Sequence, residues 1–449
     1  MTLSRRKRVL FGILGVAIVL ATSEALSLVA IRLTWSALAE PIRTTRAIYR
    51  DQSAQLRRLL TSDSGRLLVL DPLLGWRYRA GHRDPENAMN SKGLRSLREY
   101  APHPAPGTLR VAAFGDSFVY GNEVSDSGAW PALMERLFPR MEVLNYGVGG
   151  YGVDQAFLRF CSEGTALSPD VVIIGFVRDD LRRVVNVYRR FISNLELPLV
   201  KPRFALDGAD SLVLLPNPAP HPSDYERYLR GPRRVIELGA HDQWYRAAVY
   251  ENPLYDYSAT VRLLTNLWLR SDNRYLAADR LIRDGELNPS SPAFRIQVAL
   301  FERFAAAAHA AGARPIVVLF PDRKAVMEAR DGRRRAVVAP LIERLTERYV
   351  ELIDLMPAFL EPGLTGDVNT WFMSGGHYSA AGNRMVAEWL GNELARTPAR
   401  RRLIRNHDPA ATTLARACPA GTVGRSLPSG GGSGGHSQSA TARAGGHAQ

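Results

Sequence analysis

The chain has 449 residues, of which 46% are hydrophobic and 8% aromatic, which is enough apolar material for one large domain with appendages or for two domains. Its formal net charge of +14 is concentrated at the two ends: residues 5–8 carry +4, and the stretch from Arg396 onward carries +7. Only +3 remains for the body between them. This excludes the basic stripe of a nucleic-acid-binding surface, and we expect no nucleic-acid partner.

An apolar segment follows the first basic residues. It runs from Val9 to Ile31, and at about 1.5 Å of rise per residue it is long enough to cross a hydrocarbon core of about 30 Å. Glu24 lies inside it and would cost a few kcal/mol in lipid unless it found a partner. Arginines also follow the segment, so the distribution of positive charge does not fix its orientation.

Two interpretations of this segment remain open. A cleavable signal peptide has an apolar region of about 7 to 15 residues and a small-residue cleavage site. This segment is longer and has no clear A-x-A motif, which favours an uncleaved anchor. We therefore expect residues 1–35 to form a cytoplasmic stub and a single transmembrane helix, with the body of the protein outside the cytoplasm, in the periplasm.

The two cysteines, Cys161 and Cys418, are far apart in the sequence, and the second falls in a C-terminal region of low apolar content. They predict neither a disulfide framework nor a metal cluster, and they leave the compartment open. Residues 398–449 are first basic and then rich in Gly and Ser, so we expect them to form a flexible tail.

Residues 36–105 are punctuated by turn residues, as in DPLLGWRYRAG and NSKGLRS, and we expect a connector that packs onto the main domain. From 106 to 397 strands and helices alternate. The predicted strands are short, continuously apolar runs, as a parallel sheet covered by helices on both faces requires. These runs are 109–114, 141–146, 170–176, 315–320 and 349–355.

Helix ends are also readable. Between the third and fourth strands, Ser291 is placed to cap a helix that begins at Pro292 and stops at Gly312. The alternating order of strand and helix predicts an α/β domain of three layers.

The stretch 184–290 interrupts this alternation. It contains a predicted hairpin with Asp207 and Gly208 in its turn, and many aromatic residues. Such an insertion is consistent with a lid or substrate platform, and equally with a small core of its own. The aromatic residues are Tyr225, Tyr228, Trp244, Tyr245, Tyr250, Tyr255, Tyr257, Trp268 and Tyr275.

Ser117, in RVAAFGDSFVYG, follows the first predicted strand of this domain. It would lie just past the carboxyl edge of the sheet, where open α/β folds place their ligands, although Asp and Ser after a strand also commonly cap helices. A serine nucleophile needs a base within hydrogen-bond reach and donors aimed at the developing oxyanion.

Two further motifs supply these parts. LNYGVGGYG, residues 144–152, follows the second strand, and its glycines allow backbone N–H groups to approach a ligand. In GGHYSAAGNRMVAEWL, Ser379 is placed to cap a helix, which puts His377 in the loop before it. The alternatives are a plain tight turn and a surface histidine.

The order of these parts resembles the SGNH (GDSL-type) hydrolases, and in particular a bacterial membrane-anchored branch of them. The resemblance covers about residues 106–395. It implies a flavodoxin-like sheet, Ser117 as nucleophile and His377 as base. It also implies that the N–H groups of Ser117 and Gly150 contribute to an oxyanion hole.

The chain departs from this pattern twice. Asp179 stands where the family has an oxyanion-hole asparagine, and an ionised carboxylate cannot donate, so either Asp179 is protonated or the hole relies on backbone donors, with Arg178 as a group that offsets the charge. Ser374 stands where the family has an acid three residues before the histidine. The alternatives for orienting His377 are a backbone carbonyl, an acid elsewhere such as Asp367, or no acid at all, as in a Ser-His dyad.

The sequence therefore predicts a membrane-anchored serine esterase or acyl-group hydrolase that requires neither a metal nor an organic cofactor. The expected substrate is an ester-bearing small molecule or an acylated cell-surface glycan. The alternatives are an acyltransferase on the same scaffold, a lipase, and a non-catalytic binding or assembly protein.

Overall fold

The structure is a computed structural model that describes residues 4–34, 42–61, 66–271, 281–331, 337–361, 367–396 and 417–422. Its centre is a five-stranded sheet in which all neighbouring strands are parallel. The spatial order is β4-β3-β5-β10-β11, which in order of sequence is 2-1-3-4-5, the flavodoxin-like arrangement. The strands are β3 (Leu109–Phe114), β4 (Met141–Asn145), β5 (Val171–Phe176), β10 (Arg314–Leu319) and β11 (Leu352–Asp354).

Two helical layers cover this sheet because its strands are apolar on both faces. Ala112 and Phe114 of β3 face one core, with α5 (Val153–Glu163) and α10 (Pro292–Ala310). Val111 and Ala113 face the other, with α4 (Trp130–Leu137) and α14 (Ala380–Arg396). The expected three-layer α/β fold is confirmed, and the five predicted strands lie where the apolar runs placed them.

The helix α10 begins and ends as its sequence indicates. The Ser291 side chain accepts a hydrogen bond from the Phe294 N–H, Pro292 is the first helical residue, and Gly312 follows the end of the helix with φ +74°. The shorter elements of the domain are α3 (Ser117–Tyr120), α6 (Asp180–Arg183), β8 (Ile282–Arg283), β9 (Glu286–Leu287), α11 (Arg323–Arg330), α12 (Ala339–Glu347), α13 (Met356–Leu360), and the 3₁₀ helices η1 (Asp126–Gly128), η2 (Arg189–Phe191) and η6 (Val368–Trp371).

The connector folds into a helix, α2 (Thr45–Thr61), and a hairpin of β1 (Leu68–Asp71) and β2 (Gly75–Tyr78). Trp76 of this hairpin is fully buried, and its indole Nε1 donates to the Gly149 carbonyl at 3.2 Å. Gln155 of α5 in turn donates to the Leu74 carbonyl at 2.7 Å. The hairpin is thereby fixed against the glycine-rich loop that follows β4.

The insertion leaves the sheet at the carboxyl end of β5 and contains the predicted hairpin, β6 (Arg203–Leu206) paired with β7 (Leu212–Leu215). Its helices are η3 (Pro222–Arg230), α7 (Pro232–Ile236), η4 (Glu237–His241), α8 (Ala247–Tyr250) and α9 (Ala259–Ser271). Most of its described aromatic side chains are buried or half-buried, and Tyr225, Tyr228 and Trp244 join the same hydrophobic cluster as α5 and α10, whereas Tyr257 and Trp268 are exposed. Tyr275 lies outside the described residues.

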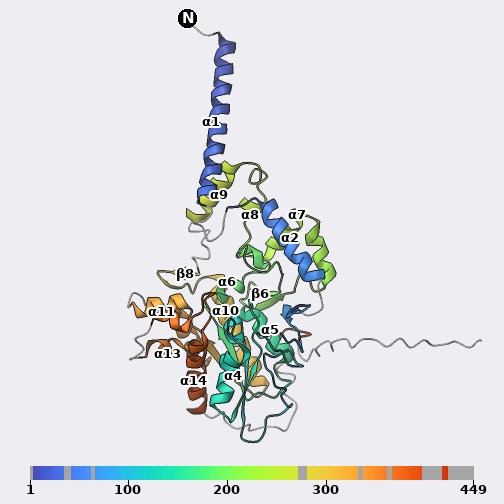
Figure 1. Ribbon diagram of the computed structural model, residues 1–449, viewed down its shortest axis with the longest axis vertical. Coiled ribbons are helices and arrows are strands. Elements are labelled where there is room, and N and C mark those ends of the chain that lie inside the picture. Colours follow the sequence, from blue (N-terminus) through green and yellow to red (C-terminus); the bar gives the residue numbers. More distant parts are fainter. Residues whose placement is uncertain are drawn as a thin grey trace, which may run out of the picture.

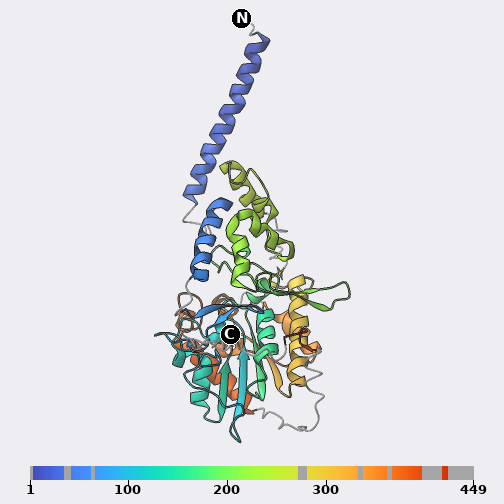
Figure 2. The ribbon, with the colours of Figure 1, turned by 90° about the vertical axis from the view of Figure 1, so that its right-hand side faces the viewer.

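The N-terminal helix α1 (Arg5–Leu33) extends as a rod from one end of the molecule (Figure 1). By length and composition it is able to cross a membrane, and its most apolar window is entirely unburied. The insertion lies between α1 and the sheet, whose strand arrows point toward the end that carries α1 (Figure 2). The carboxyl edge of the sheet therefore faces the end of the molecule that carries α1.

The cysteines correct one expectation. Cys161 in α5 and Cys418 form a disulfide, with Cα atoms 5.7 Å apart across 257 residues of sequence. The Ala417 carbonyl also accepts a hydrogen bond from Arg303 at 2.7 Å. Residues 417–422 are thus held on the body of the domain, and the prediction of a flexible tail is wrong for them, while the remainder of the predicted tail lies outside the described residues.

We expect Cys161→Ser to lower the free energy of unfolding by about 2–4 kcal/mol, because the bond closes a long loop and constrains the unfolded chain. Chemical denaturation of the full-length protein in detergent measures this. Cys418→Ser is the matched control, since it removes the same bond. Equal losses in the two single variants and no additional loss in the double variant are expected; unchanged stability in both would contradict the disulfide.

Candidate functional site

Ser117 is the first residue of α3, and only Gly115 and Asp116 separate it from the end of β3. Asp116 caps this short helix, its Oδ1 accepting from the Phe118 N–H at 2.8 Å. A Cβ on Gly115 would lie 2.4 Å from Val119 Cγ2, so the turn out of the strand requires glycine. Ser117 is 6% exposed and sits at the carboxyl edge of the sheet, beside the position where the strand order reverses.

The glycine-rich loop after β4 packs directly on α3. The Asn145 side chain donates to the Tyr120 carbonyl at 3.0 Å and accepts from the Gly147 N–H at 3.0 Å. A Cβ on Gly147 would lie 2.2 Å from the Tyr120 nitrogen, which only glycine avoids. The backbone of the loop therefore packs directly against the backbone of α3.

Gly150 lies further along this loop with φ +79°, a conformation that favours glycine. The preceding residue is fixed by the connector, since the Gly149 N–H donates to the Tyr78 hydroxyl at 3.0 Å. Within the described part of the chain, neither the Ser117 N–H nor the Gly150 N–H donates a hydrogen bond to protein. Both backbone donors are available to a ligand.

His377 lies in the loop between η6 and α14. Ser379 caps α14 as expected, its Oγ accepting from the Gly382 N–H at 3.3 Å, and Tyr378 pairs with Phe372 across the base of the loop. The imidazole packs against the Phe118 ring, with the ring centroids 5.4 Å apart. The fold thus brings His377 beside the residue that follows Ser117 in the chain.

The partner of His377 is Glu123, which the sequence did not reveal. Glu123 Oε2 lies 2.6 Å from His377 Nδ1 and accepts from the His377 N–H at 3.2 Å, while Oε1 accepts from the Gly375 N–H at 2.9 Å. Burial raises the pKa of the Glu123 carboxyl, but the hydrogen bonds from His377 and Gly375 outweigh it and lower the pKa overall. The carboxylate is therefore ionised and can only accept, so Nδ1 of His377 is the donor in this contact.

The acid expected near the histidine does not serve this purpose. Asp367 accepts from the Asn369 backbone and side chain and caps η6, and Ser374 is exposed. The glycine pair before His377 is the local sequence feature that this contact requires. A Cβ on Gly375 would lie 2.5 Å from Glu123 Oε1, so a larger residue there would displace the carboxylate. A pairing across 254 residues has no other mark in the sequence.

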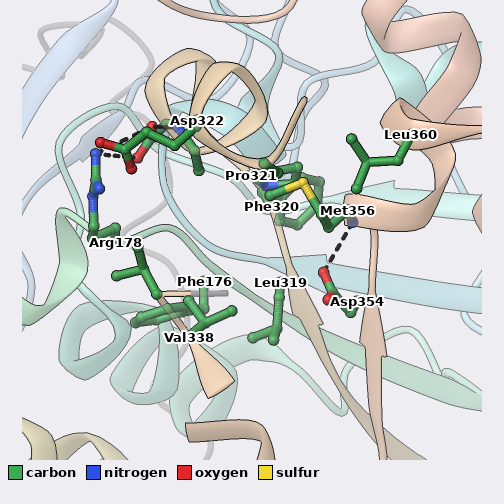
Figure 3. Close-up of a pocket in the computed structure, with 14 residues that line it drawn as sticks. Phe176, Arg178, Leu319, Phe320, Pro321, Asp322, Val338, Asp354, Met356 and Leu360 are labelled. Carbon is green, nitrogen blue, oxygen red and sulfur yellow. Dashed lines mark hydrogen bonds and ion pairs between the residues drawn. The ribbon is translucent and has the colours of Figure 1, made fainter. Parts of the chain in front are cut away.

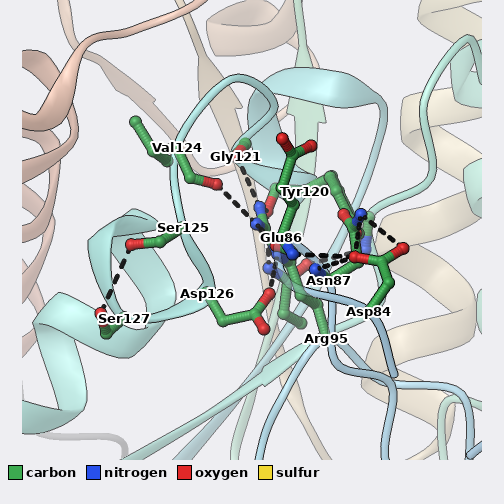
Figure 4. Close-up of polar contacts among 12 residues, drawn as sticks. Asp84, Glu86, Asn87, Arg95, Tyr120, Gly121, Val124, Ser125, Asp126 and Ser127 are labelled. Atoms are coloured by element: carbon green, nitrogen blue, oxygen red, sulfur yellow. Dashed lines mark hydrogen bonds and ion pairs between the residues drawn. The ribbon is translucent and has the colours of Figure 1, made fainter. Parts of the chain in front are cut away.

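Arg95, from the NSKGLRS stretch of the connector, holds the loop that carries Glu123 (Figure 4). Its buried guanidinium donates to the carbonyls of Tyr120 at 2.9 Å, Gly121 at 2.5 Å and Val124 at 2.7 Å, and to Asp126 Oδ1 at 2.7 Å. Glu123 itself has φ +67°, an unfavourable conformation for a residue with a side chain. The contacts of Arg95 with both sides of Glu123 stabilise that conformation.

The acidic pair after β5 takes two different places. Asp180 is buried, and the Arg183 guanidinium bridges it to Asp116 at 3.0 and 2.7 Å; burial and the neighbouring Asp116 raise the pKa of Asp180. The Asp179 side chain is 61% exposed and lies 3.7 Å from Arg182. The surrounding protein removes part of the water around Asp179, which acts to raise its pKa. The charges of Arg183 and Arg182 outweigh this effect and lower the pKa overall, so this carboxylate is ionised.

Of the two alternatives for Asp179, the ionised one is favoured, and an ionised carboxylate has no proton to donate. Arg178 contributes to lowering the pKa of Asp179, as expected, although less than Arg183 and Arg182 do. Its guanidinium also pairs with Asp322 at 3.0 Å.

A cavity of about 250 Å³ lies at the same edge of the sheet, at the carboxyl ends of β5, β10 and β11 (Figure 3). Its lining is mostly apolar, and Arg178 and Asp322 face each other on one side of it. Ser117 and His377 do not line it. The cavity wall is joined to the histidine loop through Tyr378, whose hydroxyl donates to the Pro321 carbonyl at 2.8 Å.

Fold and site together define an α/β protein with a flavodoxin-like sheet and a serine, a histidine and a glutamate at its carboxyl edge. No protein-family model matches the chain, and no curated protein matches it. Many of the solved structures that match are GDSL-family lipolytic hydrolases, the family that the motifs resemble.

One such structure is a member of the lipolytic G-D-S-L family from Veillonella parvula (12% identity, 65% of this chain, 100% of that chain, TM-score 0.30). Another is the lipase/acylhydrolase from Enterococcus faecalis (14% identity, 66% and 100%, TM-score 0.31). A third is a two-domain esterase active on acetylated mannans, co-crystallised with mannopentaose (9% identity, 69% and 54%, TM-score 0.32). At these TM-scores the likeness is slight, and the fold assignment rests on the strand order itself.

We expect Arg95→Met to lower the free energy of unfolding by about 3–5 kcal/mol, because it leaves the half-buried Asp126 carboxylate and the carbonyls of Gly121 and Val124 without this donor. Arg98→Met is the matched control: its guanidinium is half exposed, and loss of its pairs with Glu135 and Glu142 should cost less than about 1 kcal/mol. Denaturant unfolding of both variants measures the difference. Equal losses would show that Arg95 does not hold the loop.

Proposed function

We propose that this protein is a membrane-anchored serine esterase or acyl-group hydrolase. Ser117 is the nucleophile, His377 the general base and acid, and Glu123 the carboxylate that orients the imidazole. The observation that carries the proposal is the 2.6 Å contact between Glu123 and His377 Nδ1, on a histidine packed against the residue next to Ser117. A charged acceptor on Nδ1 leaves Nε2 as the basic atom, which a serine nucleophile requires.

The chemistry follows from these roles. The Ser117 hydroxyl attacks the ester carbonyl while Nε2 of His377 takes its proton, and the resulting imidazolium is stabilised by Glu123. The imidazolium then protonates the departing alcohol, leaving an acyl-enzyme. Water attacks the acyl-enzyme with His377 again as base, and the acid is released as the serine is restored.

The oxyanion of each tetrahedral intermediate is proposed to be bound by the N–H groups of Ser117 and Gly150, which have no protein acceptor among the described residues. Asp179 supplies no donor because it is ionised. Loss of one such donor typically costs about 100- to 1,000-fold in turnover, so we expect slow hydrolysis compared with a site that has a side-chain donor.

The substrate class that we propose is an ester outside the cytoplasm, such as the O-acyl groups of a cell-surface glycan. Two features support this placement. The helix α1 is long and apolar enough to anchor the chain, and the disulfide between Cys161 and Cys418 is of the kind that persists in oxidising compartments such as the periplasm.

Fluorophosphonate labelling of the full-length protein in detergent tests the nucleophile. Mass spectrometry is expected to place the adduct on Ser117, because the reagent requires an activated hydroxyl. Ser117→Ala and His377→Ala should abolish labelling, whereas Ser211→Ala, on the exposed hairpin turn of the insertion, should leave it unchanged. A folded protein that does not label would contradict the proposal and favour a binding or assembly role.

Glu123→Gln is expected to reduce kcat for p-nitrophenyl acetate hydrolysis by about 10²- to 10⁴-fold, because a neutral amide no longer fixes the tautomer or stabilises the imidazolium. Glu347→Gln, an exposed glutamate of α12, is the control and should retain full activity. If Glu123→Gln retained wild-type kcat, the site would work as a Ser-His dyad. Repeating the assay with oligosaccharide acceptors separates hydrolysis from acyl transfer, since only a transferase accelerates release of p-nitrophenol when the acceptor is added.

A further inference from the structure

Glu24 is a carboxylate within the apolar helix α1, and the structure provides its partner. Its oxygens accept from the Ser258 hydroxyl at 2.8 Å, from the Thr260 N–H at 3.1 Å and from the Ala259 N–H. The Ala259 and Thr260 N–H groups belong to the first turn of α9, where backbone N–H groups have no acceptor within the helix. One side chain of α1 therefore caps a helix that begins 235 residues later in the sequence.

Two further contacts fix α9 against the same part of α1. The Ser27 hydroxyl, one turn further along α1, donates to Thr260 Oγ1 at 3.1 Å. Ile31 then packs with Ala259 and the half-buried Leu263. The last third of α1 thus forms a two-helix unit with the start of α9, as the neighbouring positions of the two helices show (Figure 1).

The side of α9 adjacent to these contacts is apolar and exposed. Leu264 is 59%, Leu267 51% and Trp268 51% exposed, and their i, i+3, i+4 spacing places them on one side of the helix. Between residues 259 and 269 the only charged side chain is Arg262, which is buried and donates to the Tyr255 carbonyl. A water-facing helix would carry charges on this side.

The exposed apolar surface of α1 extends along the part of the helix that contacts α9. Leu26, Val29 and Leu33 lie beyond Glu24 and remain exposed, on the side of α1 turned away from its contacts with α9. Two residues before α9, the exposed Tyr257 ring lies under the Arg46 guanidinium at 4.7 Å. Tyrosine, tryptophan and arginine are the side chains that gather where a membrane meets water.

We propose that α9 lies in the membrane interface beside α1, with Leu264, Leu267 and Trp268 in contact with lipid. The occupant of this face is the phospholipid bilayer, because α9 is joined to a helix long enough to span one, along a stretch where that helix still exposes apolar side chains and would lie at the membrane boundary. The protein is then held on the membrane by two helices. This inference rests on the membrane anchor of the proposed function.

Spin labelling of the full-length protein in nanodiscs of phosphatidylethanolamine and phosphatidylglycerol tests it. The two native cysteines are disulfide-bonded, so one introduced thiol carries the nitroxide. Labels at Leu264→Cys and Leu267→Cys are expected to be reached by oxygen several times more readily than by a water-soluble nickel chelate. Tyr349→Cys, 97% exposed at the amino edge of the sheet, is the control and should show the reverse.

A label in the middle of α1, at Leu14→Cys, tests the membrane anchor separately from the placement of α9. If it reports lipid while both α9 labels behave like the label at 349, the anchor stands and the inference about α9 is overturned. If the label at Leu14 also reports water, the anchor itself fails. Dipolar broadening between nitroxides on different molecules would instead identify a second copy of the chain on this face. That result would equally overturn lipid contact.

Discussion

The hydrogen bonds of the Glu123 carboxylate join the two loops that the candidate site needs. One loop follows α3, the short helix that begins with Ser117, and the other precedes α14 and carries His377. Without a charged acceptor between them, the imidazole would be held mainly by its contact with Phe118. The surrounding structure is arranged to keep that carboxylate in place: Arg95 fixes the loop on either side of Glu123, and Gly375 leaves room for the carboxylate.

The sheet and most of its surroundings could be predicted from the sequence because their signals are local. Five continuous apolar runs indicated strands buried on both faces, and Ser291, Pro292 and Gly312 marked a helix from end to end. Ser117 and His377 could be singled out as candidates for the same reason, since each stands beside a strand or helix end that short stretches define.

What escaped prediction depends on contacts between distant residues. Glu123 pairs with His377 across 254 residues, and Cys161 pairs with Cys418 across 257. No composition or periodicity marks such a pair, and the second cysteine lies in a stretch whose composition resembles a flexible tail. Glu24 is a third case: a costly residue in an apolar segment implied a partner, but only the fold shows that the partner is the start of α9.

The position of Glu123 in the chain has a consequence for how this site can evolve and fail. Ser117 and Glu123 lie within seven consecutive residues, on a turn that packs against the glycine-rich loop after β4. Their relative placement is therefore inherited as a single short peptide, whereas His377 comes from a distant loop. A displacement of the histidine loop would remove the contacts of His377 with Glu123 and with Phe118 together, so the imidazole would lose both supports at once.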